Sequence, residues 1–422
     1  MRRALTLVAL LALACRSGPD ERVLRFWAMG SEGERVRALV PDFERAHPGL
    51  TVEVQSIPWT AAHEKLLTAH VGHTTPDAAQ LGNTWIPEFT ALGALAPLDE
   101  RIAAAKLERV DFFPGIWDTN VVDGETWGLP WYVDTRVIFY RTDLVAAAGG
   151  PWPPRTWNEW RATLERLKKL AGPDRFAILL PVDEWDKPVL LGLEAGATLL
   201  ADGRRGAFRD PRFRRAMSFY TGLYADRLAP PLDLTGLVNL YQQFVEGYFA
   251  MVVTGPWNLG EFRRRLPAAF QDRWSTAPLP AADDGAPYPG ASLAGGASLV
   301  MFRAARLPEE TWEWIRYLAA AKQQARFYEL TGDLPARRSA WEASGLAADP
   351  RAAAFLTQLG HVVPAPKVPE WEQIATRIAE CAEQIARGGS DVDAALARLD
   401  ADVDRMLERR RYLLDRAARG AP

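Results

Sequence analysis

The stretch GLPWYVDTRVIFYRTD, residues 128–143, has the composition of a buried β-strand, with two apolar segments rich in Trp, Tyr, Val, Ile and Phe. Asp134, Thr135 and Arg136 nevertheless stand in its middle. An unpaired buried acid destabilises a fold by several kcal/mol, so Asp134 needs either a partner or contact with water or a ligand. Arg136 is one candidate partner, because residues two apart on a strand share a face. The alternative is that this part of the strand lines a cleft.

The composition is that of a soluble globular protein with more than one domain. A chain of 422 residues, 48% hydrophobic and 24% charged, has material for about two or three domains. The formal charge of −3 gives no electrostatic argument for binding nucleic acid or an anionic membrane. The sixteen Trp residues are unusual, and many lie beside turns and polar residues, where amphipathic rings often form contact surfaces.

Residues 1–15 have the pattern of an export signal: two arginines, an apolar run too short to span a bilayer, and Cys15 after a small residue. The run fits an ordinary A-x-A cleavage site, but a cysteine in this place resembles a bacterial lipoprotein signal. Leu13 stands where a small residue is more usual. The polar tether RSGPDER after Cys15 favours lipidation, and either interpretation predicts an exported protein. The other cysteine, Cys381, has no partner without Cys15, so a disulfide scaffold is excluded.

Strand and helix signals alternate along the chain, which predicts an α/β fold. Alternating or apolar runs at 23–27 and 50–57 flank a helix that a capping box opens at Ser31, so the segment forms a βαβ unit with parallel strands. A second capping box at Thr156 opens the helix WNEWRATLERLKKLAG. The last fifty residues are almost wholly helical.

In open α/β sheets, ligands bind beyond the carboxyl ends of the strands. This rule selects the turns WAMGSE, LGNTW, WYVDTR, PVDEWD and TGPWN, each of which combines a Trp with a polar side chain. A ring beside acids and amides suits a carbohydrate, whose C–H faces pack on the ring while its hydroxyls form hydrogen bonds. Trp257 is the strongest stacking candidate, whereas Trp27, Trp85 and Trp131 fit a core position as well as a contact. Glu32 has the alternative role of serving a helix N-terminus.

Catalytic and metal-binding motifs are poorly represented. There is no G-x-S-x-G, Walker A or H-E-x-x-H motif. His63, His70 and His73 fit one helix face, but Gly72 weakens that helix and no fourth ligand is apparent, so neither a metal nor a cofactor is predicted. A secreted glycosidase with two cleft carboxylates stays open as an alternative, because the separation of such acids is a tertiary property.

The order of several motifs resembles that of extracellular solute-binding proteins of sugar ABC importers, in the group that binds maltose, trehalose and glycerol phosphate. The motifs are GNTWIPEFTALGALAPLD, GLPWYVDTRVIFYRTDL with PPRTWNEW, FAMVVTGPWN, GGASLVMF and TGDLPARRSAW. The resemblance covers essentially the whole mature chain, and it indicates the family more strongly than the particular sugar.

The resemblance implies a two-lobe, type II periplasmic-binding-protein-like fold with three interlobe crossovers and a ligand cleft between the lobes. The crossovers are expected near Val133–Asp134, near Leu279 and near Leu334–Arg337. The N-terminal lobe then comprises residues 22–133 and 279–335, and the C-terminal lobe residues 134–278 and 336–422. By this interpretation Asp134 lines the cleft.

The same resemblance implies the ligand contacts. Polar contacts fall on Glu32, Asn83, Thr84, Asp134, Gly295 and Gly296, and the stacking ring of the second lobe falls on Trp257. Looser matches are Glu184, Trp185 and Trp371, and Arg337 is expected to reach the cleft from the third crossover. With Trp85 and Arg136, chosen from the turns, these are the predicted ligand-binding residues.

The predicted function is that of a non-enzymatic, monomeric receptor, periplasmic or on the cell surface, that captures a neutral di- or trisaccharide and delivers it to a membrane permease. A glycerol-phosphate diester is the alternative ligand. It requires a basic cleft, whereas acidic and amide residues outnumber Arg136 and Arg337 in the selected turns.

Overall fold

The stretch at 128–143 forms two strands that belong to two different sheets. Strand β6 (Leu129–Asp134) lies in a six-stranded sheet, and β7 (Val137–Arg141) lies in a four-stranded sheet. Only Thr135 and Arg136 separate them, so the polar residues mark the passage of the chain between two sheets.

The computed structural model describes residues 22–233, 239–283 and 285–419. The predicted export signal and the lipidation site Cys15 lie outside the described residues.

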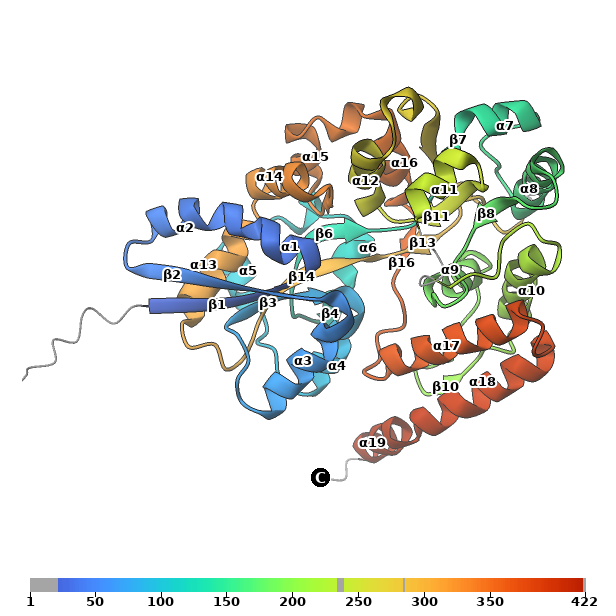
Figure 1. Ribbon diagram of the computed structural model, residues 1–422. Helices are drawn as coiled ribbons and strands as arrows, with labels where there is room; N and C mark the ends of the chain where they lie inside the picture. Colours follow the sequence, from blue (N-terminus) through green and yellow to red (C-terminus); the bar gives the residue numbers. More distant parts are fainter. Residues whose placement is uncertain (1–21, 234–238, 284, 420–422) are drawn as a thin grey trace, which may run out of the picture.

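The six-stranded sheet is the centre of the first lobe (Figure 1). Its order is β15-β6-β14-β3-β1-β2, with β1 parallel to both β2 and β3, as the βαβ pattern predicts, and β14 antiparallel to β3 and β6. The strands are β1 (Arg22–Met29), β2 (Leu50–Ile57), β3 (Ala78–Gly82), β14 (Gly295–Met301) and β15 (Leu334–Pro335), besides β6. The helices around this sheet include α1 (Gly30–Arg35), α2 (Val40–Ala46), α3 (Trp59–Val71), α4 (Ile86–Ala91), α13 (Pro308–Leu318) and α14 (Ala321–Thr331).

The predicted capping box at Ser31 is wrong. Helix α1 begins at Gly30, its N-cap Met29 makes no side-chain cap, and the Ser31 hydroxyl donates to Glu32 Oε2 at 3.2 Å instead. A 3-10 turn at Val36–Leu39 then separates α1 from α2. Ser31 therefore does not cap a helix, and the helix expected to begin there is interrupted after Arg35.

The four-stranded sheet, in the order β12-β7-β11-β8, is the centre of the second lobe. Its strands are β7, β8 (Phe176–Leu179), β11 (Phe249–Thr254) and β12 (Trp274–Ala277). The N-cap at Thr156 is confirmed: Thr156 Oγ1 accepts from Glu159 N at 3.3 Å and opens α8 (Trp157–Ala171). The Glu159 carboxylate accepts from Arg155 N at 2.6 Å. The other helices on this side include α9 (Asp186–Glu194), α10 (Pro211–Ala225), α11 (Leu240–Glu246), α12 (Trp257–Arg265), α16 (Pro350–Gln358), α17 (Trp371–Ala386) and α18 (Val392–Met406).

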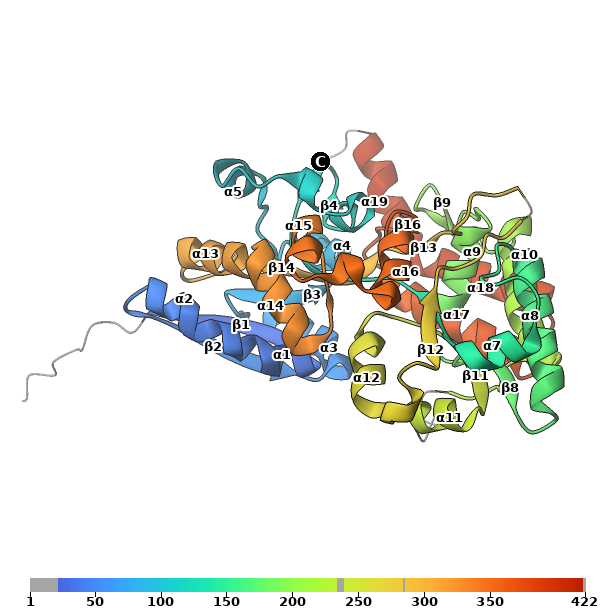
Figure 2. The ribbon, with the colours of Figure 1, turned by 90° about the horizontal axis from the view of Figure 1, so that it is seen from above.

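The chain connects the two sheets three times, as Figures 1 and 2 show in two views. The first connection is β6 to β7, the second runs from β12 to β14, and the third leaves β15 toward α16, which packs on β12. Along the second connection, β13 (Ser292–Leu293) pairs with β16 (Val362–Val363). The two-lobe architecture with three crossovers is thus confirmed, while the residue at which each lobe ends stays a prediction.

One buried apolar cluster extends through both lobes. Phe26 and Trp131 of the first sheet belong to the same cluster as Phe139 and Trp274 of the second. Phe355 of α16 packs edge-on against Phe139, with the ring centroids 6.0 Å apart. The lobes are therefore joined by packed side chains as well as by the three crossovers.

Candidate functional site

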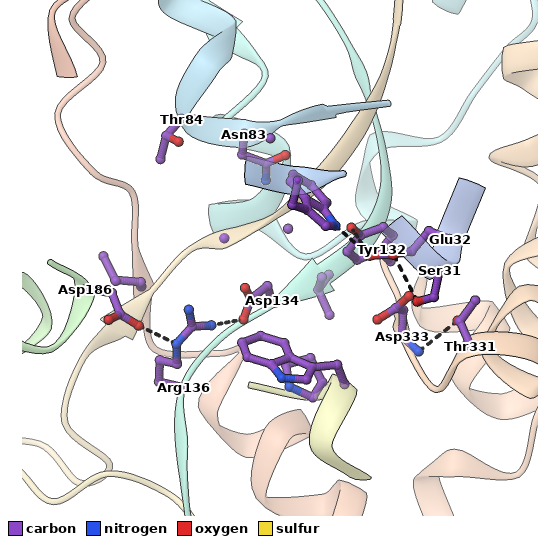
Figure 3. A pocket seen from close by; sticks show the side chains of 18 of the residues that line it. Ser31, Glu32, Asn83, Thr84, Tyr132, Asp134, Arg136, Asp186, Thr331 and Asp333 are labelled. Carbon is purple, nitrogen blue, oxygen red and sulfur yellow. Dashed lines mark hydrogen bonds and ion pairs between the residues drawn. The ribbon is translucent and has the colours of Figure 1, made fainter. Parts of the chain in front are cut away.

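A cavity of about 970 Å³ lies between the two lobes. Its lining includes the residues that follow β1, β2 and β3 in the first lobe and those that follow β8 and β11 in the second. The carboxyl ends of parallel strands thus meet at this cavity, as expected for an α/β fold. Figure 3 shows its polar side chains converging from several elements.

The paired strands β6 and β14 form one wall of the cavity. Gly295 lies opposite Asp134 in the register and Gly296 lies opposite Val133. Gly296 has φ of +133°, and a Cβ there would stand 2.3 Å from the Tyr132 carbonyl oxygen. Glycine is therefore required for the close approach of the two strands.

A chain of hydrogen bonds fixes the Glu32 carboxylate at one end of the cavity. Gln80 Nε2 donates to Tyr132 Oη at 2.8 Å, so the Tyr132 hydroxyl is free to donate to Glu32 Oε1, 3.1 Å away. Trp59 Nε1 donates to the same oxygen at 3.3 Å. Donors from β6 and α3, together with the Ser31 hydroxyl of its own helix, therefore hold the carboxylate at the wall of the cavity.

Asp333 lies at the same end and is only 6% exposed. Burial, reinforced by the nearby Glu32 carboxylate, raises the pKa of Asp333 to about 8, against the smaller opposing effect of a hydrogen bond from the Thr331 side chain. Asp333 is therefore mostly protonated at neutral pH, and a protonated carboxyl both donates and accepts hydrogen bonds.

Arg136 is the centre of an ion-pair network at the other end. It pairs with Asp134, and its Nε lies 2.6 Å from Asp186 Oδ2. Burial opposes ionisation of Asp186, but the charges of Lys187 and Arg136 outweigh it and lower the pKa to about 2. Burial raises the pKa of Asp134 in spite of its Arg136 partner. Both interpretations of Asp134 thus hold, since it is paired and it also lines the cavity.

Aromatic rings line both lobes of the cavity. Trp257 is 38% exposed and Trp59 is 37% exposed, so both offer ring surface. The Arg136 guanidinium carbon lies over the Trp257 ring, 4.8 Å from its centroid. The further rings in the lining are Trp85, Tyr132, Trp185 and Tyr241.

Most of the residues selected from the sequence come together at this cavity. Those that line it are Glu32, Asn83, Thr84, Trp85, Asp134, Arg136, Trp185, Trp257, Gly295 and Gly296. Whether they contact a ligand stays a prediction.

Glu184, Trp371 and Arg337 are not part of this lining. Glu184 accepts from Lys187 Nζ at 2.6 Å, and Trp371 is buried behind Trp185, with the two rings edge to face at 5.6 Å. Arg337 does not reach the cleft: its Nε bonds Asp111 Oδ2 at 2.6 Å, and its guanidinium lies over the Phe112 ring.

Several lining residues were missed. Trp59 lies two residues beyond the end of β2, so the strand-end rule would have found it. Tyr132 shares a strand face with Asp134, so the strand period would have found it. Asp186 and Glu372 each lie one residue beyond a predicted residue. Asp333 follows the C-cap Gly332 of α14 and carries no signal that marks it in the sequence.

Within the described ranges, no three His, Cys, Asp or Glu side chains are grouped as a metal site requires. His63 Nε2 instead lies 2.7 Å from Glu88 Oε2. No helix in the described part of the chain is long and apolar enough to span a membrane.

Comparison with known proteins places the chain in a family. Residues 29–325 match the family described as bacterial extracellular solute-binding protein. The fold is similar to that of the sugar-binding protein MalE from the phytopathogen Xanthomonas citri, with a TM-score of 0.88 and 44% identity, over 93% of this chain and 99% of that one. The diacetylchitobiose binding protein DasA of Streptomyces coelicolor is 26% identical over 382 residues, which is 88% of this chain and 87% of DasA. The galactooligosaccharide-binding protein of Bacillus subtilis is 24% identical over 394 residues, 91% of this chain and 89% of that protein. Because the family match covers well over half of the sequence, the chain belongs to the bacterial extracellular solute-binding proteins.

Proposed function

We propose that this protein is the substrate-binding component of an ABC importer and that it captures a neutral di- or trisaccharide by closure of its lobes. The observation that carries the proposal is the cavity between the lobes, in which exposed rings such as Trp257 and Trp59 alternate with acids and amides such as Glu32 and Asn83. Rings pack on the C–H faces of a sugar, and acids and amides bind its hydroxyls.

The charges of the cavity favour a neutral ligand over a phosphodiester. Six acidic side chains line the cavity against four arginines, which are Arg35, Arg136, Arg264 and Arg265. Arg136 pairs with Asp134 and Asp186, and Arg264 and Arg265 share Glu261. A phosphodiester site needs basic side chains that are free to bind the phosphate. The relatives named above bind sugars by their names, which agrees with this assignment.

Export, a lipid anchor on Cys15, a monomeric state and delivery to permease subunits complete the proposal. The family is extracellular, which supports export. Sugar that bridges the lobes shifts the population toward the closed form, which the permease recognises. A micromolar dissociation constant, about −8 kcal/mol, suffices for such a receptor.

A thermal-shift screen of residues 16–422 against neutral sugars, sugar phosphates and polyols tests the proposal. A sugar at about a hundred times its dissociation constant stabilises the folded state by about 2.7 kcal/mol, which raises the melting temperature by a few degrees. The expected result is a shift with a neutral di- or trisaccharide that is recovered intact.

The other outcomes contradict the proposal in distinct ways. A shift only with phosphorylated ligands assigns the site to phosphodiesters. Recovery of cleaved sugar assigns it to a glycosidase, and the carboxylates of the cavity then become the candidates for its acid and base.

A further inference from the structure

The Arg136 side chain is held by carboxylates from two different elements. Its Nε lies 2.6 Å from Asp186 Oδ2, at the start of α9, and its Nη1 pairs with Asp134, the last residue of β6. Figure 3 shows Arg136 between these two acids. Burial opposes the charge of Arg136, but Asp134 and Asp186 outweigh that effect and raise its pKa, so the guanidinium is a cation held in place.

The backbone of Arg136 is fixed as well. Its N–H donates to Ser292 Oγ at 3.0 Å, and the Ser292 hydroxyl donates to the Arg136 carbonyl oxygen at 3.1 Å. Ser292 is fully buried in β13, on the second connection between the sheets, so two crossovers are tied together at Arg136. A side chain anchored at its backbone and by two carboxylates has lost most of its rotamer freedom, and it can support a neighbour.

That neighbour is the Trp257 ring. The Arg136 guanidinium carbon lies over this ring, 4.8 Å from its centroid. Trp185, another ring of the lining, packs edge to face against the buried Trp371, whereas Trp257 begins α12 and is 38% exposed. A cation over an indole ring is attracted to it, so Arg136 limits the orientations that the exposed Trp257 ring can take.

A lysine does not fit the place of Arg136. An ammonium is a compact charge on a flexible stem, whereas a guanidinium is planar and carries five donors in a fixed fork, so it can bind two carboxylates and cover a ring at once. We propose that Arg136 is a positioning residue of the sugar site and that it holds the Trp257 ring in the orientation that stacks on the sugar. The inference rests on the proposed function, and it gives Arg136 a role other than the direct ligand contact expected from the sequence.

Fluorine NMR of the protein labelled with 5-fluorotryptophan tests the position of the ring without any sugar. The Trp257 resonance is the one that is absent from Trp257→Phe. We expect Arg136→Lys to move this resonance toward the position of free 5-fluorotryptophan in water, because the ring is released from the guanidinium.

Arg141→Lys is the matched control. Arg141 lies in β7, is 6% exposed, pairs with Asp143 and lies over the Phe270 ring, all outside the lining of the cavity. It therefore resembles Arg136 in burial, in its ion pair and in its ring contact. Arg141→Lys should leave both the Trp257 resonance and the sugar affinity unchanged.

A double-mutant cycle measured by calorimetric titration tests the effect on binding. Residues 16–422 are titrated with maltose, trehalose and maltotriose as the wild type, Arg136→Lys, Trp257→Ala and the double variant. We expect Arg136→Lys to weaken binding about five- to tenfold on its own, and less than about twofold in the Trp257→Ala background. Urea unfolding shows whether each variant is folded. If Arg136→Lys does not fold, Arg136→Gln, whose planar amide carries no charge, takes its place with the same expectation.

The outcomes distinguish the inference from the function. If a sugar binds but Arg136→Lys weakens binding equally with and without the Trp257 ring, Arg136 contacts the sugar or serves the fold, and the positioning role is excluded. If Arg136→Lys leaves the sugar affinity or the Trp257 resonance unchanged, the inference is wrong and the receptor function stands. If the wild type binds no neutral sugar, the proposed function fails, and the inference fails with it.

Discussion

Asp333 carries a proton in the folded protein that it lacks when unfolded, because burial and the Glu32 carboxylate raise its pKa from 3.8 to about 8. Between pH 4 and 8 the folded state therefore binds more protons at this residue, and the free energy of unfolding falls as pH rises. Asp333→Asn removes this contribution. We expect urea unfolding at a series of pH values to give a flatter pH dependence for Asp333→Asn than for the wild type.

The control is Asp391→Asn, which changes an exposed N-cap carboxylate far from the cavity and keeps a side-chain oxygen to accept from Ala394 N. Equal pH slopes for the wild type and Asp333→Asn would show that Asp333 is ionised in the fold.

Trp257 offers a partly exposed ring at the cavity, and its loss removes a stacking surface without opening a buried core. We expect Trp257→Ala to bind the sugar at least about tenfold more weakly, with an unchanged unfolding midpoint. Calorimetric titration beside urea unfolding measures both quantities. An affinity equal to that of the wild type would exclude Trp257 from the site.

Several residues selected from the sequence line the cavity, while others miss the lining by one or two positions, and the reason for that limit is physical. Trp371 was chosen where the next residue, Glu372, lines the cavity, and the chosen Trp185 lines it together with Asp186, whereas Glu184 does not. Successive residues of a helix point about 100° apart, so an uncertainty of one residue at a helix start exchanges a lining side chain for a buried one. Residues beside a strand end, such as Asn83, escape this ambiguity because the strand fixes their direction.

At the level of the elements, the N-cap of α8 gives a direct test of the sequence argument. Thr156 Oγ1 accepts from Glu159 N, and this bond satisfies one of the free backbone donors at the start of the helix. We expect Thr156→Ala to lower the free energy of unfolding by about 1 kcal/mol. Urea unfolding checks this value against Thr68→Ala, which changes an exposed position inside α3 and should have an effect below about 0.5 kcal/mol. Equal stabilities of the two variants would contradict the cap.

The turn between β11 and α12 positions the Trp257 ring. A Cβ added to Gly255 would stand 1.9 Å from Trp257 Cζ3, so Gly255→Ala must move the ring. We expect a loss of sugar affinity of about tenfold, as for removal of the ring, together with a change in tryptophan fluorescence. Gly360→Ala is the control, because its Cβ has space. Unchanged affinity in Gly255→Ala would separate the ring position from binding.

The polar interruption of the 128–143 stretch predicted that Asp134 is either paired or lines a cleft. Local signals predicted most strands and helices. These local signals did not predict that β6 and β7 lie in different sheets. That expectation came from the family resemblance, which implied a crossover near Val133–Asp134. An apolar run reports that a strand is buried but not which strands bury it, since pairing is a non-local property. The Ser31 motif failed for a local reason, because its hydroxyl bonds the neighbouring Glu32 instead of a backbone N–H.

For the whole molecule, the proposed function requires that the two lobes close around the sugar. Three crossovers and a shared cavity predict a rigid-body closure around the sugar. We expect small-angle scattering to give a smaller radius of gyration when a bound sugar is present than when it is absent. A radius that does not change with a bound sugar would indicate that the protein is already closed without it.

The apolar cluster that runs from Phe26 through Phe355 to Trp274 has a consequence for how the protein loses its structure. Much of the second lobe packs in a cluster of its own, which includes Trp160 and Tyr220. Phe139 and Trp274 of its sheet nevertheless belong to the cluster of the first lobe, and this shared packing couples the two lobes. Differential scanning calorimetry of the sugar-free protein should therefore give a single endotherm, with calorimetric and van't Hoff enthalpies in agreement. If the two lobes unfold together, we expect them also to lose their protection from proteolysis together.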